Sequence, residues 1–134
     1  MDKAVLQSAL AEYFAPWVQA LGLRVEGFDA DSVTLRLPQN DELSRVGGML
    51  CGQAMMAAAD TAMVLALINQ SGQFRPCTTV QMNTSFLKPL SSQDAMIQAR
   101  VLRAGKSLAF GEIDIRCADD GKSVCRASVT YALL

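Results

Sequence analysis

The feature that most constrains this chain is a run of 20 residues, 49–68, that is apolar at all but a few positions. Ala, Met and Leu dominate the run, and these residues favour the helical state. A helix that is apolar on nearly every side must be buried in a protein core or in a bilayer. One carboxylate, Asp60, interrupts the run. A charge in this setting is costly, so Asp60 is predicted to act in a site, to cap a helix or to face solvent.

The length of this run would suit a membrane span, which is the first alternative. An aspartate at the centre of a span costs about 2.5–3.5 kcal/mol, and the many alanines offset little of that cost. The chain beyond residue 72 changes to a period of two, which is typical of strands with one apolar face. The apolar face of such strands must be covered, so burial of the helix against the strands is favoured over a membrane span.

The remaining patterns predict a single α+β domain over residues 1–134, with an antiparallel sheet of about six strands around one long central helix. Pro16 is expected to mark the end of the first helix. The expected elements are a helix over 1–19, a hairpin over 20–38, the central helix over 49–70 and a four-strand meander over 76–134.

Composition excludes several classes of function. The chain has no histidine, which excludes Ser-His-Asp and Cys-His nucleophile systems and the histidine-dependent dehydratases. Twelve basic and thirteen acidic residues leave a net charge of −1, so no nucleic-acid partner is predicted. The four cysteines form no CxxC pair, and no metal or other cofactor is predicted. The N-terminus has no secretory pattern, so reduced thiols and a cytoplasmic location are expected.

Four segments, in this order and spacing, resemble the acyl-CoA thioesterase superfamily of the hotdog fold, in the branch that includes phenylacetyl-CoA thioesterases. They are GGMLCGQAMMAAADTAM, TTVQMNTSFLKP, RVLRAGKSLAFGEIDI and DGKSVCRASVTYAL. The resemblance extends over about residues 20–134. It implies hydrolysis of a small or medium acyl or aryl thioester of coenzyme A.

The resemblance also implies roles for three residues. Asp60 corresponds to the acid that serves as general base or nucleophile, and Gly52, eight residues earlier, to the glycine whose N–H polarises the carbonyl. A free N–H at a helix start suits a developing oxyanion, so the physical chemistry agrees. Thr79 corresponds roughly to a hydroxyl residue that positions water in some relatives, with a one-residue uncertainty toward Thr78.

The chain departs from the family pattern beside Gly52. Cys51-Gly52-Gln53 replaces the His-Gly-Gly of many relatives, and Arg45 stands where Asn or Gln is frequent. Cys51 is better explained as a small buried residue than as a catalytic thiol. Lys88, Arg103 and Lys106 are expected to cluster at strand ends and bind the phosphates of coenzyme A, or to be ordinary solvated turn residues. Together the predicted substrate-binding residues are Arg45, Cys51, Gln53, Asn83, Lys88, Arg103 and Lys106.

Relatives place their sites at a dimer interface, and an open sheet leaves edge strands that need a partner. A homodimer or homotetramer is therefore expected. Two alternatives to the thioesterase stay open from the sequence. The first is a hotdog module that binds acyl-CoA without cleaving it. The second is a small membrane protein in which Asp60 lies in a span. For Asp60 itself, the alternative to a catalytic role is the N-cap of a separate helix that starts at this residue.

Overall fold

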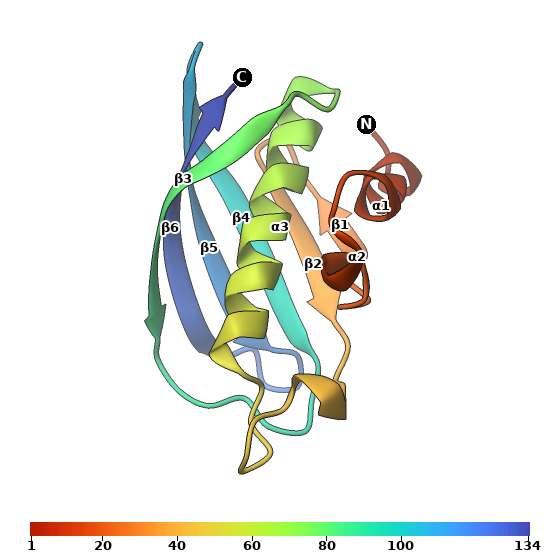
Figure 1. Ribbon diagram of the computed structural model, residues 1–134, viewed down its shortest axis with the longest axis vertical. Coiled ribbons are helices and arrows are strands. Elements are labelled where there is room, and N and C mark those ends of the chain that lie inside the picture. The colour runs from red at the N-terminus through yellow and green to blue at the C-terminus, as the bar shows by residue number, and fades with distance from the viewer.

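The computed structural model describes residues 1–134 as one antiparallel sheet wrapped around one long helix (Figure 1). The helices are α1 (Lys3–Glu12), α2 (Pro16–Gln19) and α3 (Gly52–Ser71), with a 3-10 turn at Asp41–Leu43. The strands are β1 (Arg24–Phe28), β2 (Ser32–Leu37), β3 (Cys77–Phe86), β4 (Ala95–Ala104), β5 (Leu108–Cys117) and β6 (Ser123–Leu133). The predicted α+β layers are confirmed.

The predicted four-strand meander is wrong in one respect. The sheet order is β1-β2-β4-β5-β6-β3, so β4, β5 and β6 form a meander while β3 pairs with β6 at the edge. The connection between β3 and β4, residues 87–94, is longer than the 2–5 residues of a tight hairpin. It runs beneath the end of the sheet, which allows β3 to lie far from β4 (Figure 1).

The central helix α3 is continuous from Gly52 to Ser71. Asp60 therefore lies in its middle, and the N-cap explanation for Asp60 is wrong. The helix ends at Gly72, whose φ of 85° is the left-handed C-cap conformation that glycine adopts easily. Most of α3 is buried against the sheet, which explains why the sequence is apolar on nearly all sides.

The single N-terminal helix predicted over 1–19 is divided in two. Asp2 caps α1 by accepting a hydrogen bond of 2.9 Å from the Val5 N–H. Ala15 is extended, with φ −57° and ψ 149°, and Pro16 then begins α2. Proline disfavours helical geometry in the residue before it but is well suited to the first helical position. Pro16 therefore starts a helix here rather than ending one.

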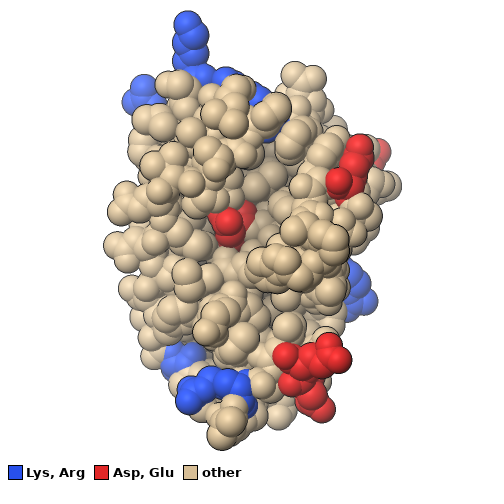
Figure 2. Space-filling model, in the orientation of Figure 1, with Lys and Arg blue, Asp and Glu red and all other residues tan.

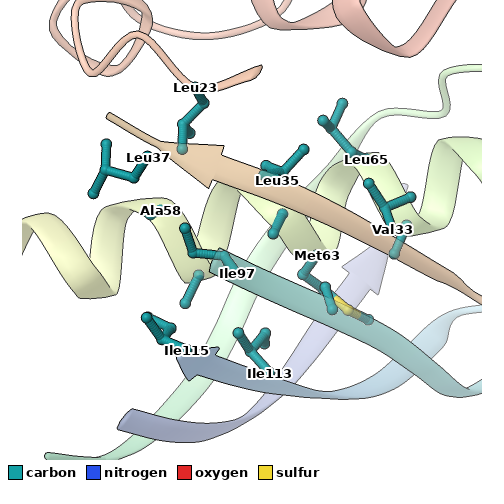
Figure 3. Packing of buried hydrophobic residues seen from close by; sticks show 14 of the residues in the cluster. Leu23, Val33, Leu35, Leu37, Ala58, Met63, Leu65, Ile97, Ile113 and Ile115 are labelled. Atoms are coloured by element: carbon teal, nitrogen blue, oxygen red, sulfur yellow. The ribbon is translucent and has the colours of Figure 1, made fainter. Parts of the chain in front are cut away.

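The core lies between the concave face of the sheet and α3 (Figure 3). Leu35 of β2, Ile97 of β4 and Ile113 of β5 point toward Met63 and Leu65 of α3, and all five are almost fully buried. The alternation predicted for these strands is thus confirmed. Burial of apolar surface on this scale fixes α3 on the sheet and so fixes where Asp60 emerges.

One glycine of the core is needed for packing. A Cβ at Gly111 would lie 2.4 Å from the Met63 sulfur and 2.9 Å from the Arg100 carbonyl oxygen. We expect Gly111→Ala to lower the free energy of unfolding by about 1–3 kcal/mol, because overpacking forces side-chain and backbone shifts. Gly27→Ala is the matched control, since a Cβ at this strand position meets no atom within 4 Å. Urea unfolding of both variants tests the prediction, and equal stability would contradict it.

The register of β3 changes at Val80, where the pairing with β6 contains a bulge. Thr79 pairs with Tyr131 before the bulge, and Gln81 pairs with Thr130 after it. Strict alternation of side chains along β3 would place Thr78 and Met82 on one face of the sheet and Thr79 on the other. The extra residue instead brings both Thr79 and Met82 to the concave face. It is this bulge that directs the Thr79 hydroxyl at α3.

Candidate active site

Asp60 is the only acidic residue of α3 and β3. It is half-buried, on the side of α3 that faces β3 and β6. Figure 2 shows an acidic group in a hollow between these elements, in the middle of a face whose other charged groups lie toward its rim. The carboxylate is thus open to solvent on one side and enclosed on the other, as a reacting group must be.

Two hydroxyl groups hold one oxygen of this carboxylate. The Thr79 hydroxyl donates to Asp60 Oδ1 at 2.8 Å, and the Tyr131 hydroxyl donates to the same oxygen. The Tyr131 hydroxyl also lies 3.1 Å from the Asp60 carbonyl oxygen. The second carboxylate oxygen, Oδ2, accepts no hydrogen bond from the protein. The side chain is therefore fixed by Oδ1 and has Oδ2 free for chemistry.

Tyr131 was not predicted as a site residue, because burial in the core was sufficient to explain a tyrosine on the apolar face of the last strand. The side chain is only 2% exposed. Burial raises the pKa of Tyr131, and the Asp60 charge and its hydrogen bond raise it further, so the phenol stays neutral and donates. A usable signal existed: a buried tyrosine hydroxyl needs a partner, and Asp60 was the one acid in the apolar core segment.

A second group of predicted residues surrounds the start of α3. The N–H of Gly52, the first helical residue, has no hydrogen-bond partner. Arg45, Gly52 and Lys88 line one surface hollow of about 410 Å³, with the Phe86 ring against the glycine. A free amide and two cations at a helix N-terminus form a site suited to anions and oxyanions.

The two residues that flank Gly52 take different positions. Cys51 is the N-cap and makes no side-chain capping bond, while its N–H donates to the Leu43 carbonyl oxygen at 2.9 Å. Its thiol is half-buried, and Gln53 is exposed in the first turn of α3. All four cysteines are free.

Three of the predicted substrate-binding residues are not brought to these groups. Asn83 lies on the outer face of the sheet, beside Glu112 and Arg126, and not on the face that holds Asp60. Arg103 and Lys106 lie at the turn between β4 and β5, near the C-terminal end of α3. A helix of 20 residues is about 30 Å long, so within one chain they do not cluster with Lys88. Figure 2 shows basic groups near both ends of this face.

The match to a known family includes residues of both groups, although Arg45 and Tyr131 lie outside it. The model of the thioesterase superfamily matches residues 47–124, which include Gly52, Asp60 and Thr79. The chain belongs to the thioesterase superfamily. No helix of this thioesterase-superfamily protein combines the length and hydrophobicity that crossing a membrane requires.

Individual relatives agree with the family match. Thioesterase PA1618 of Pseudomonas aeruginosa is 29% identical over 116 residues, which are 85% of this chain and 79% of that protein. The structure of a PA1618 mutant has been solved. Its alignment with this protein includes 100% of this chain and 94% of the PA1618 chain, with a TM-score of 0.87 at 26% identity.

Two further solved structures share the fold at lower identity. The alignment with thioesterase HI1161 of Haemophilus influenzae includes 100% of this chain and 91% of the HI1161 chain, with a TM-score of 0.88 at 21% identity. A hypothetical thioesterase protein of Streptococcus pneumoniae was solved with coenzyme A. Its alignment with this protein includes 84% of this chain and 85% of the Streptococcus chain, with a TM-score of 0.76 at 18% identity. The predicted hotdog fold is confirmed.

Proposed function

We propose that this protein hydrolyses acyl-CoA thioesters and that Asp60 is its catalytic carboxylate. The observation that carries the proposal is the state of the carboxylate, with Oδ1 held by two hydroxyl donors and Oδ2 free in a hollow whose immediate surroundings carry no other charge. A carboxylate held in this way is pre-positioned for reaction, because folding has already fixed its orientation and the transition state does not have to.

The proposed chemistry needs no group beyond the protein and water. As a general base, Asp60 Oδ2 takes a proton from water while the water oxygen attacks the thioester carbonyl carbon. The tetrahedral oxyanion then collapses, the carbon–sulfur bond breaks, and the proton passes to the departing thiolate. As a nucleophile, Oδ2 itself attacks and expels the thiolate, and water hydrolyses the resulting anhydride. Both routes give a free acid and coenzyme A.

Either route needs a donor for the oxyanion, and we propose the Gly52 N–H in this role. Within one chain the eight residues between Gly52 and Asp60 amount to about 12 Å along the helix axis. An oxyanion donor must lie about 3 Å from the developing charge, so the two groups of one chain cannot serve the same carbonyl. We infer that Gly52 of one protomer works with Asp60 of a second.

Two exposed features support a second copy at this position. The free edge of β3 presents unpaired backbone groups over ten residues, with Val80 59% and Phe86 50% exposed. The stripe of α3 that is not covered by its own sheet contains Met56, Asp60 and Val64. A two-fold axis that pairs two β3 edges antiparallel would set two such stripes side by side in opposite directions. The proposed assembly is this dimer, alone or within a tetramer.

The same arrangement gives the basic residues a common purpose. Because the two α3 helices would run in opposite directions, Arg45 and Lys88 of one protomer would approach the end of its neighbour that carries Arg103 and Lys106. Cations at a pocket rim suit the phosphates of coenzyme A. The Streptococcus pneumoniae protein of this fold was solved with coenzyme A, which agrees with this choice of substrate.

The test is steady-state hydrolysis of short, medium, long and aryl acyl-CoA thioesters, followed by loss of thioester absorbance. A thiol dye would react with the four free cysteines. We expect turnover of at least one class of thioester. Saturable binding of acyl-CoA by the folded protein, with no turnover of any class, would instead support the non-catalytic binding module.

The proposed mechanism predicts a graded effect for Tyr131→Phe. The variant keeps the buried ring and loses one of the two donors to Asp60 Oδ1, so we expect kcat to fall about tenfold, the value of one hydrogen bond to a charged group. KM should change little, because the phenol contacts the carboxylate and not the substrate. Tyr13→Phe is the control, since this exposed tyrosine stacks on Phe74 and donates no side-chain hydrogen bond. Unchanged kcat in Tyr131→Phe would show that Thr79 alone orients Asp60.

A further inference from the structure

A cavity of about 190 Å³ lies along the C-terminal half of α3, and it begins at Val64, four residues after Asp60. Its walls come from α3, the start of β3, the end of β6 and the turn between β4 and β5, which meet at the upper end of Figure 1. Near Asp60 the walls are apolar, formed by Val64, Leu67, Cys77 and Leu133. No residue of this cavity belongs to the group around Gly52.

Asp60 itself does not line the cavity, but residues next to it on the helix and on the sheet do. Val64 lies one helical turn beyond Asp60. On the sheet, Thr79 and Tyr131 are paired and contact Asp60, and the next pair that faces α3 is Cys77 with Leu133. Burial and the Asp60 charge raise the pKa of Cys77, while the Arg75 charge acts in the opposite direction. The Cys77 thiol is thus influenced by the charges of both Asp60 and Arg75.

The far end of the cavity is polar and basic. Arg75, Gln70 and Gln73 line it there. The Arg75 guanidinium is anchored to main-chain oxygens, through Nη2 to Lys106 at 2.9 Å and through Nε to Leu134 at 3.4 Å. Its Nη1 makes no hydrogen bond, and no aspartate or glutamate forms an ion pair with it. Arg75 is exposed, and these two main-chain contacts orient its guanidinium and leave one nitrogen free to bind a carboxylate oxygen.

We propose that this cavity holds the acyl group and selects a short acyl chain that ends in a carboxylate, bound by Arg75. The proposal rests on the proposed function, because it places the thioester carbonyl at Asp60. The size of the cavity supports a short chain, since a cavity of about 150 Å³ holds a molecule the size of benzene. The order of its walls, apolar beside Asp60 and cationic at the far end, matches methylene groups followed by an anion.

The experiment compares thioesters of equal length that differ only at the far end. Succinyl-CoA, glutaryl-CoA and adipyl-CoA are measured beside butyryl-CoA, pentanoyl-CoA and hexanoyl-CoA, with wild type, Arg75→Gln and Arg75→Lys. We expect wild type to favour at least one diacid thioester over its neutral partner by tenfold or more in kcat/KM, the value of one charge-assisted hydrogen bond. Arg75→Gln should remove this preference and leave the neutral series within twofold, while Arg75→Lys keeps part of it.

Arg24→Gln, an exposed arginine of β1 on the other sheet edge, is the charge-matched control and should leave the preference unchanged. Thermal unfolding of every variant separates a loss of folding from a loss of preference. Calorimetric binding of glutaryl-CoA and pentanoyl-CoA to Asp60→Asn gives a readout that needs no turnover.

The outcomes distinguish this inference from the proposed function. Hydrolysis with equal rates for both series, or a diacid preference that survives Arg75→Gln, overturns the inference and leaves the thioesterase in place. Tighter binding of glutaryl-CoA that depends on Arg75, without turnover in wild type, supports the subsite and overturns the catalytic proposal. Equal binding of the two ligands without turnover overturns both.

Discussion

Asp60→Asn is expected to lower kcat by about a thousandfold, within the range that a positioned acid or base contributes. Asparagine has nearly the same shape and retains an oxygen to accept the hydrogen bonds from Thr79 and Tyr131. It carries no negative charge, so it neither attacks a carbonyl nor takes a proton from water. Turnover is measured on the best thioester of the panel, by its absorbance.

The control for this prediction is Asp119→Asn, at the exposed turn between β5 and β6. It removes the same charge from a residue that makes no contact with Asp60, Thr79 or Tyr131, and it should retain the wild-type rate. The thermal midpoint of Asp60→Asn should stay close to that of wild type, because the two hydroxyl donors keep an acceptor. A variant with the full rate would exclude Asp60 as the catalytic group.

Gly52→Pro is expected to lower kcat by about a hundredfold or more, the value of one oxyanion donor. Proline removes the N–H and adds a ring that is favoured at the first helical position, which Gly52 occupies. Cys51, with φ −71° and ψ 149°, already has the extended conformation that a following proline requires. Gly52→Ala is the matched control, because it adds the same Cβ, 3.2 Å from the Phe86 ring, and keeps the N–H.

Mixing the two inactive proteins tests whether each site is shared between protomers. Asp60→Asn and Gly52→Pro, refolded together in equal amounts, form mixed dimers in which one site has an intact glycine and an intact acid. With half of the dimers mixed and one of two sites active in each, about a quarter of the wild-type activity should return. If Gly52 and Asp60 acted within one chain, mixing would restore nothing. Sedimentation of each protein confirms that it assembles.

Local patterns were sufficient for most of the elements. The helix around Asp60 follows from a long run of apolar helix formers, and the strands β2, β4 and β5 follow from a period of 2, because both signals depend on residues close in sequence. The prediction failed at Pro16, where the same residue type is compatible with a helix end and a helix start. The predicted meander was wrong at β3, because an alternating pattern indicates that a segment is a strand but not which strand it pairs with.

The sequence by itself indicated that a long apolar helix with one acid lies under a sheet, since the alternating strands that follow the helix have an apolar face to cover. Only the tertiary structure decided what surrounds that acid. The bulge at Val80 turns Thr79 inward, and the pairing of β3 with β6 sets Tyr131 beside it. The rigid rise of α3 holds Gly52 and Asp60 about 12 Å apart. These are contacts between residues distant in the chain, and their geometry depends on strand register, which a single shifted residue changes.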